Sequence, residues 1–250
     1  MGGRVGVAAL NTADGAWLRH RADERFAMCS SFKVLLAASV LARIDQGTLA
    51  PDRRVDYTRA DLLDHSPRTQ ARVGQGFMSV ADLCAAAVEV SDNGAANLLL
   101  GLTGGPAALT AWLRRIGDPT TRLDRTELSL NTNLPGDPRD TTTPQAFVAT
   151  LDRLLLGRVL SAESRGRLAD WMIKCETGRD RLRAGVPPTW RAGDKTGTGA
   201  NGAVNDVAIL WPPGRAPILI AVLMSGSTRP VADLNSAHAR IARLVVSAFA

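Results

Sequence analysis

Lysine and aromatic residues are scarce in this sequence, and their scarcity argues against several functions. Aromatic residues make up 4% of the 250 residues, whereas Lys and Arg together number 30. The only lysines are Lys33, Lys174 and Lys195, so arginine supplies nearly all of the positive charge. The arginines are spread singly along the chain, without a basic block interleaved with aromatic rings. A nucleic-acid partner is therefore not expected, despite a net charge of +6.

Cysteine is also rare, and its pattern indicates neither a metal site nor a disulfide framework. The three cysteines are odd in number and far apart: Cys29, Cys84 and Cys175. Their spacing fits no zinc motif. The three histidines are equally scattered, so neither a Ser-His-Asp triad nor a zinc-binding pattern is visible. We expect no metal and no cofactor.

The sequence lacks any run of about eighteen apolar residues free of charge, so no membrane span is predicted. Its start, Met1-Gly-Gly-Arg, leads directly into a strand-like segment, without the charged and apolar regions of a leader. On these features alone, the protein is either cytoplasmic or a product from which a leader has been removed. An apolar fraction of 45% and a mean hydropathy of −0.02 suit one large domain or two interleaved ones.

The segment from Arg25 to Gln46 is the most informative stretch of the chain. From Ser30 onward it is apolar on almost every turn, which predicts a helix buried in the centre of a domain. Ser30 and Lys33 are three residues apart and share a helix face. A hydroxyl in the first turn with an amine one turn later suits an activated serine nucleophile. Equally, Ser30 could be a helix cap and Lys33 a solvent-reaching side chain.

Strand-like and helix-like patterns are distributed unevenly along the chain. Strands are predicted near both ends, at residues 4–11, 15–20, 190–195, 203–211 and 217–224, and helices fill the middle. A long helix is predicted over residues 231–249. The expected fold is therefore α/β plus all-α, with one antiparallel five-stranded sheet built from both chain ends and flanked by helices. Residues 1–28 and 176–250 would form the α/β lobe, and residues 29–175 an inserted all-helical lobe.

Three further groups of polar residues are each ambiguous when taken alone. Ser91-Asp92-Asn93 lies between two predicted helices. An extended backbone there would point Ser91 and Asn93 to one side and Asp92 to the other, but taken alone these residues are better explained as a helix-capping cluster. Glu127 and Asn131 open a long loop over residues 123–142, where they could hold a water molecule or simply be solvated. Lys195-Thr-Gly ends a strand and could admit a ligand or form a turn.

The four motifs S-x-x-K, S-D-N, E-x-x-x-N and K-T-G occur in this order, and together they resemble those of the class A serine β-lactamases. The resemblance extends nearly end to end and includes residues 135–144 and 205–212. It implies the β-lactamase and penicillin-binding transpeptidase-like fold, with the active site in a cleft between two lobes. It also implies hydrolysis of the β-lactam ring of antibiotics through a serine acyl-enzyme, and hence antibiotic resistance. A periplasmic or secreted monomer without a cofactor is expected.

The resemblance assigns catalytic roles position by position. Ser30 would be the nucleophile, and either Lys33 or Glu127, acting through water, would accept its proton. Glu127 would activate the water that hydrolyses the acyl-enzyme. Ser91 would pass a proton to the leaving nitrogen, with Lys195 tuning its hydroxyl group.

The resemblance also implies which residues bind the substrate. The backbone N–H groups of Ser30 and Thr198 would form the oxyanion hole. The remaining substrate contacts would come from both sides of the cleft: Asn93, Asn131, Thr196, Gly197, Thr198, Arg181 and His65. Arg181 would take over the carboxylate-binding role that many members give to the position of Val204, and His65 would replace an aromatic residue at the entrance.

The resemblance also points to residues that would hold the site in place without taking part in the reaction. Arg125 and Asp140 match the ion pair that closes the long loop at its neck. Leu128 stands where many members have proline, and we predict that the bond before it is nevertheless cis. Cys29 would pack beneath the nucleophile, because the partner of its disulfide in some carbapenem-hydrolysing members is replaced here by Gly199.

Two other functions share part of this pattern. A cell-wall D,D-peptidase or transpeptidase would also carry the serine, lysine and K-T-G motifs. A non-hydrolytic β-lactam sensor would remain acylated. Glu127 and Asn131 argue for the hydrolase, because the other two classes lack this water site in the loop.

Overall fold

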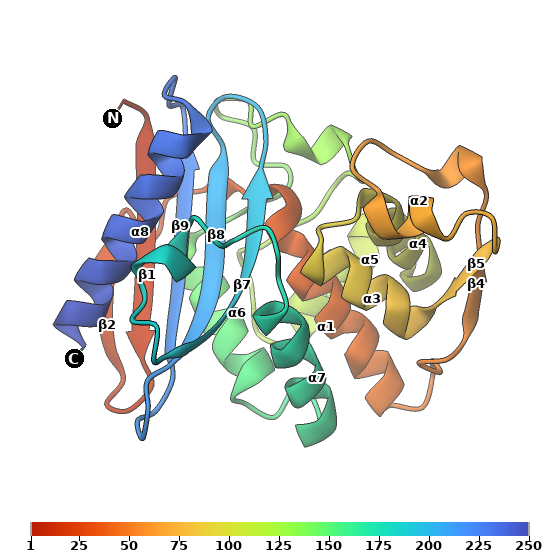
Figure 1. Ribbon diagram of the computed structural model, residues 1–250, viewed down its shortest axis with the longest axis horizontal. Coiled ribbons are helices and arrows are strands. Elements are labelled where there is room, and N and C mark those ends of the chain that lie inside the picture. Colours follow the sequence, from red (N-terminus) through yellow and green to blue (C-terminus); the bar gives the residue numbers. More distant parts are fainter. Residues whose placement is uncertain (1, 250) are drawn as a thin grey trace.

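A five-stranded antiparallel sheet forms one half of the molecule and confirms the expected fold class. The computed structural model describes residues 2–249. Both ends of the chain lie in this half (Figure 1). The strand order is β2-β1-β9-β8-β7, with bounds of Arg4–Asn11 for β1, Ala16–His20 for β2, Arg191–Thr198 for β7, Val204–Trp211 for β8 and Ile218–Ser225 for β9. The first strand pairs with the last from Arg4–Ser225 to Asn11–Ile218, which joins the two chain ends.

Helices cover both faces of the sheet, which explains why its central strands are almost continuously apolar. Alternate residues of β9 belong to two different cores. Ile220 and Val222 pack with Leu234 of α8 (Val231–Ala248) on one face. Leu219 and Ala221 belong to the core that includes α6 (Pro144–Leu155) on the other face. Successive residues of this strand therefore face opposite sides of the sheet and contribute to two different cores.

Helix α1 (Phe32–Asp45) runs through the centre of the other half of the molecule (Figure 1). It follows a short 3₁₀ turn at Cys29–Ser31, and its first eleven residues are all buried. The helices packed around it are α3 (Val80–Glu89), α4 (Asn93–Thr103), α5 (Gly105–Arg115) and α7 (Ala162–Ile173). The prediction of a buried helix from its all-round apolar pattern is confirmed.

The segment expected to be entirely helical contains short strands as well. Strand β3 (Phe26–Ala27) pairs with β6 (Thr141–Thr142), and β4 (Arg54–Asp56) pairs with β5 (Phe77–Ser79). The remaining short elements are α2 (Pro67–Ala71) and 3₁₀ turns at Arg59–Asp61, Ser129–Asn131 and Leu182–Gly185. In addition, α6 packs against β1 and β9, so part of segment 29–175 belongs structurally with the sheet. The division at residues 28 and 176 stays a proposal.

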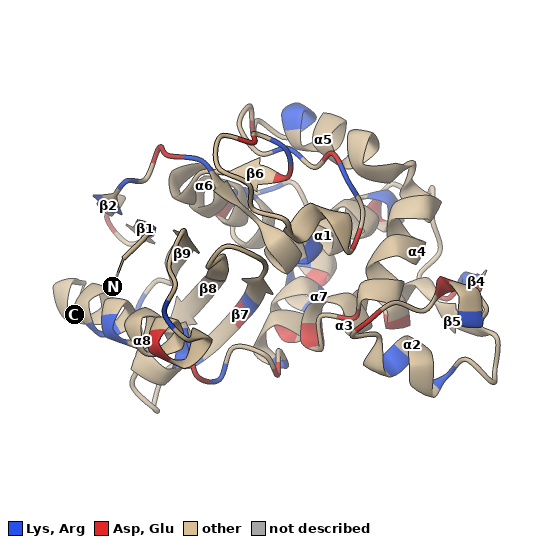
Figure 2. Cartoon of the chain, turned by 90° about the horizontal axis from the view of Figure 1, so that it is seen from above, with Lys and Arg blue, Asp and Glu red and all other residues tan. Residues whose placement is uncertain are grey.

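Charged residues are scattered over both halves of the molecule (Figure 2). This distribution agrees with the absence of a basic block in the sequence. Among residues 2–249, no helix combines the length and the apolar character needed to cross a membrane.

Candidate active site

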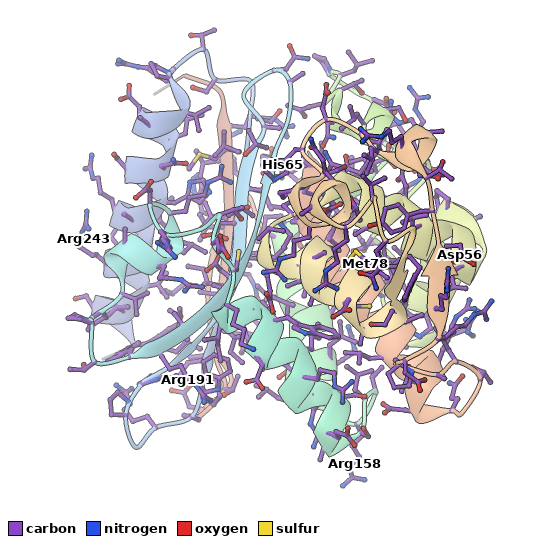
Figure 3. The ribbon with its side chains drawn as sticks, turned by 45° about the vertical axis from the view of Figure 1, so that its right-hand side comes forward. Asp56, His65, Met78, Arg158, Arg191 and Arg243 are labelled. Carbon is purple, nitrogen blue, oxygen red and sulfur yellow. The ribbon has the colours of Figure 1, made fainter. Side chains whose placement is uncertain are left out.

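The four sequence motifs meet at a cavity of about 530 Å³ between the β7 edge of the sheet and the helical half. Figure 3 shows His65 at the boundary between these halves. The cavity is lined by Ser30, Asp64, His65, Ser91, Asn93, Leu128, Asn131, Thr177, Arg181, Thr196, Gly197 and Thr198. Lys33, Glu127 and Lys195 are bonded to this lining, as described below. All of the motif residues predicted from the sequence are therefore brought together.

Ser30 occupies the 3₁₀ turn that precedes α1, where strand β7 packs closely against the turn. Gly197 permits this approach. A Cβ atom at Gly197 would lie 2.5 Å from the carbonyl oxygen of Met28 and 3.0 Å from the backbone nitrogen of Ser31. The glycine of the K-T-G motif thus allows the strand edge to reach the nucleophile.

Glu127 links the nucleophile to the long loop. Its Oε1 accepts a hydrogen bond from Ser30 Oγ at 2.9 Å and lies 3.0 Å from Lys33 Nζ. Its Oε2 accepts a hydrogen bond of 2.6 Å from Asn131 Nδ2. The side chains of Lys33 and Glu127 are both fully buried, so their ion pair is weakly screened.

Lys33 and Ser91 are joined in the floor of the cavity. Lys33 Nζ donates to the carbonyl oxygen of Ser91 at 2.8 Å and also to Asn93 Oδ1. Burial lowers the pKa of Lys33 below its ordinary value, and the neighbouring Glu127 opposes that shift. The amine is therefore held where its proton can be released more readily than in water.

Ser91 lies between the two buried lysines. Its Oγ accepts a hydrogen bond from Lys195 Nζ at 3.0 Å and lies 3.4 Å from Lys33 Nζ. Ser91 has a φ of 59° and is not extended. Asp92 nevertheless points away from the lysines, since it caps α4 through Ala95 N. The extended backbone on which the predicted separation depended is wrong for Ser91, whereas the helix-capping interpretation is confirmed for Asp92.

Lys195 is fully buried at the base of the cavity. Burial, with a smaller contribution from the charge of Lys33, lowers its pKa to about 8. Its Nζ also donates to the carbonyl oxygen of Thr196 at 2.8 Å. This amine is charged at neutral pH but titrates within a readily accessible range.

Arg181 provides a third cation at the cavity, after Lys33 and Lys195. Its Nη2 donates to Thr198 Oγ1 at 2.7 Å, and its Nη1 donates to the carbonyl oxygens of Gly197 and Asn205 at 3.1 and 2.6 Å. Its Nε donates to Asn235 Oδ1 at 2.9 Å. Although burial lowers the pKa of Arg181, a guanidinium stays protonated in proteins. The structure therefore holds this cation beside the K-T-G strand, where the sequence predicted it.

Asp206 is a buried carboxyl group that acts electrostatically on Arg181. Asp206 is fully buried on β8, and burial together with the neighbouring Asp194 raises its pKa well above the usual range. It accepts a hydrogen bond of 3.0 Å from Leu182 N. The raised pKa disfavours the ionised form of Asp206, which weakens its opposition to the charge of Arg181.

The neck of the long loop is closed as the sequence predicted. Arg125 Nε and Asp140 Oδ2 form an ion pair of 2.6 Å, and Asp140 also accepts hydrogen bonds from the backbone nitrogens of Asp124 and Arg125. The peptide bond between Glu127 and Leu128 is cis, which confirms that prediction. The ion pair and the backbone hydrogen bonds of Asp140 hold the two ends of the loop together.

Two other predicted residues occupy the expected places. His65 is exposed at the cavity entrance, and its Nε2 donates to the carbonyl oxygen of Val90 at 2.8 Å. Cys29 is completely buried with a free thiol. A Cβ atom at Gly199 would lie 2.7 Å from Cys29 Sγ, so the thiol fills the space next to this glycine.

Sequence reasoning missed Asn97, Thr177 and Asn235. Asn97 makes paired hydrogen bonds to the backbone of Glu127, at 3.0 Å from Glu127 N and 2.8 Å to its carbonyl oxygen. Thr177 Oγ1 lies 2.5 Å from Thr196 Oγ1. Asn97 lies one helical turn after Asn93, which is a spacing that could have suggested a shared face. No local signal marks Thr177 or Asn235.

This fold and site define a serine acyl-transfer enzyme, in which a buried carboxylate and two lysines surround the nucleophile. The family model described as "Beta-lactamase enzyme family" matches residues 1–249. Beta-lactamase AST-1 of Nocardia asteroides is 49% identical over 247 residues, covering 99% of this chain and 79% of the relative. The carbapenem-hydrolyzing beta-lactamase KPC of Klebsiella oxytoca is 48% identical, with coverages of 98% and 84%.

A solved structure gives the same result at the level of the fold. The class A beta-lactamase described as the last common ancestor of Gram-negative bacteria is 60% identical, with a TM-score of 0.98 and coverages of 100% and 95%. The chain therefore belongs to the β-lactamase enzyme family, within class A. It hydrolyses the β-lactam ring and so confers antibiotic resistance; the peptidase and sensor alternatives are not favoured.

Proposed function

We propose that this β-lactamase works through Ser30, with Glu127 handling protons in both acylation and deacylation. The observation that carries this proposal is the double contact of Glu127, through one oxygen to Ser30 Oγ and through the other to Asn131 Nδ2. A general base must lie within hydrogen-bond reach of the proton it removes. Glu127 meets that condition for Ser30.

In acylation, Glu127 accepts the proton of Ser30 as its Oγ attacks the β-lactam carbonyl carbon. Lys33 lies 3.0 Å from the same carboxylate oxygen and stabilises the charge there. Ser91 then passes a proton to the leaving nitrogen. Its hydroxyl accepts from Lys195 Nζ and lies 3.4 Å from Lys33 Nζ. The proton that Glu127 took from Ser30 returns through Lys33 to Ser91, so Glu127 is again a carboxylate before deacylation.

In deacylation, Glu127 and Asn131 hold and activate the hydrolytic water. Asn131 Oδ1 is buried and receives no hydrogen bond from the described residues. A buried acceptor without a donor is costly, and a water molecule between Asn131 and Glu127 would supply the hydrogen bond. The water attacks the acyl carbon while Glu127 takes its proton, and Glu127 then passes that proton to Ser30 Oγ as the acyl bond to Ser30 breaks.

The substrate is held by its charge and by its carbonyl oxygen. The backbone N–H groups of Ser30 and Thr198 form the oxyanion hole, and loss of one such donor typically costs about 3 kcal/mol of transition-state stabilisation. Thr196, Thr198 and Arg181 bind the substrate carboxylate at the cationic end of the cavity. Asn93 binds the side-chain amide, although in this structure its Oδ1 accepts from Lys33, so substrate must share or displace that contact.

The substrates are penicillins and cephalosporins with an anionic carboxylate, bound by one copy of the chain. We propose that the protein acts as a monomer in the periplasm or outside the cell. His65 borders the entrance and contacts the substrate side chain there.

Replacement of Glu127 by glutamine tests this function directly. Glu127→Gln keeps the shape and the contact with Asn131 but removes the base from both steps. Acylation then depends on the neighbouring Lys33 and slows, whereas deacylation has no second base, so incubation with a penicillin should still leave a covalent acyl group on Ser30. Intact mass spectrometry would detect the adduct, and steady-state turnover should fall at least a hundredfold. Ser30→Ala is the matched control and should show no adduct. Unchanged turnover in Glu127→Gln would remove Glu127 from its proposed role.

A further inference from the structure

A second cavity, of about 470 Å³, borders the loop that carries Glu127 and shares no lining residue with the catalytic cavity. Its volume lies in the range of small-molecule sites. One wall is the loop segment 133–139. The other walls come from Arg4 at the start of β1, from residues 24–27, which lead into β3, and from Ser225 at the end of β9. Its charged lining residues are Arg4, Glu24, Arg25, Arg125, Asp137 and Arg139.

Arginine dominates the charge around this cavity. Three of the four guanidinium groups are matched by carboxylates in ion pairs of 2.6–2.8 Å: Arg4 with Glu24, Arg125 with Asp140 and Arg139 with Asp137. The Arg139 hydrogen bonds also lower the pKa of Asp137 to about 2. Asp137 therefore stays ionised and paired with Arg139.

Arg25 is the unmatched cation. Its Nη1 donates to the carbonyl oxygen of Thr120 and to Thr141 Oγ1, both at 3.0 Å. Across residues 2–249, its guanidinium forms no ion pair with a carboxylate. Two neutral contacts through Nη1 hold the group in place, while the rest of its planar donor fork remains available. Such a fork matches the oxygens of a carboxylate or phosphate.

The loop wall of the cavity is fixed in shape. Asn133 adopts a φ of 45°, and its Nδ2 donates to the carbonyl oxygens of Ala200 and Asn201 at 3.2 and 3.0 Å. It also donates to Ser225 Oγ at 3.0 Å. These contacts attach the loop to the sheet, so the cavity exists without a ligand.

We propose that this second cavity binds a small oxyanion, with the chemistry of phosphate or a carboxylate, and that Arg25 is its main partner. The bound anion would balance the surplus guanidinium charge and connect Arg25 to the loop wall. Because Arg125 both lines the cavity and closes the loop neck, occupancy would also tighten the loop that holds Glu127. That last effect rests on the proposed role of Glu127; the binding itself does not.

Isothermal titration calorimetry with inorganic phosphate, and separately with succinate, tests the binding at constant ionic strength with chloride as the reference ion. The catalytic cavity is also cationic, so its own anion binding must be separated. Arg181→Gln weakens that site. We expect Arg181→Gln to retain one binding event and the double variant with Arg25→Gln to lose it, with an affinity at least tenfold weaker. Arg158→Gln is the matched control, because Arg158 is exposed and lines neither of the two cavities.

Arg25→Lys serves as a second variant if Arg25→Gln does not fold. Lysine keeps the charge but loses the planar fork, so the same event should weaken severalfold. Identical titrations of the Arg25 and Arg158 variants, or no event in Arg181→Gln with either anion, would overturn the proposal. Whichever anion binds tighter identifies the ligand as phosphate-like or carboxylate-like. No β-lactam is used, so failure here leaves the hydrolytic function untouched.

Discussion

The charge of Lys195 gives a quantitative test of the catalytic cavity. Burial lowers the pKa of this amine to about 8. The protonated form donates to Ser91 Oγ and adds to the positive charge with which Arg181 attracts a substrate carboxylate. Raising the pH through that pKa removes the charge of Lys195, so activity should fall as the pH rises. An amine with this pKa keeps about nine-tenths of its charge at pH 7 and about one-tenth at pH 9. We therefore expect kcat/KM to fall roughly tenfold between those pH values.

The assay is the kcat/KM of a chromogenic cephalosporin between pH 6 and 10 at constant ionic strength. This parameter reports the ionisation of the free enzyme. Lys195→Arg is the matched variant, since a guanidinium keeps its charge throughout the range. The basic limb of the profile should disappear in that variant, even if its overall rate is lower. A wild-type profile that is flat to pH 9.5 would contradict the expected titration.

Lys33 offers a competing explanation that the same data can separate. Its pKa is also lowered by burial, and it also contacts the reacting groups. If the basic limb persists unchanged in Lys195→Arg, the titrating amine is Lys33 and the reasoning about Lys195 is wrong. A cephalosporin ester, which lacks the carboxylate, provides a further check. The ester removes the attraction between the cationic cavity and the carboxylate but leaves the contact of Lys195 with Ser91 Oγ. A limb that remains with the ester points to the contact of Lys195 with Ser91 Oγ.

Two further predictions concern residues that support the site. Asp140→Asn breaks the buried ion pair with Arg125, so urea denaturation should show a loss of roughly 3 kcal/mol in unfolding free energy; a loss below about 0.5 kcal/mol would show that the pair does not hold the loop. Thr177→Val removes the hydroxyl that contacts Thr196 while keeping its volume. Its KM should rise severalfold at unchanged kcat, and an equal KM would exclude a positioning role for Thr177.

Much of the catalytic cavity could be predicted because its residues occur in short motifs on regular elements. The all-round apolar pattern after Ser30 identified α1, and the spacing of Ser30 and Lys33 placed both on one face. The strand-like segments at the two chain ends predicted the sheet that pairs β1 with β9. In each case, local periodicity was sufficient, because the element buries a regular pattern of side chains.

The remaining features depend on contacts between distant parts of the chain. The amphipathic pattern of α6 indicated a helix but could not tell that it covers the sheet. Ser91 reaches the lysines through a left-handed backbone, which its sequence does not require of a non-glycine residue. The contact between Thr177 and Thr196 joins hydroxyl groups from two different elements. Such pairings are decided by tertiary packing, so no local pattern records them.

The burial of the catalytic residues explains both their reactivity and their sensitivity to substitution. A buried ion pair such as Lys33–Glu127 is poor evidence for stability, because the cost of desolvating two charges can exceed their attraction. Here the same desolvation lowers the pKa of both Lys33 and Lys195, which is what proton transfer and charge recognition require. Removing one charge leaves the other buried and uncompensated. Amide or guanidinium replacements that keep shape and hydrogen bonds are therefore more informative than alanine, whose effects would combine lost chemistry with lost stability.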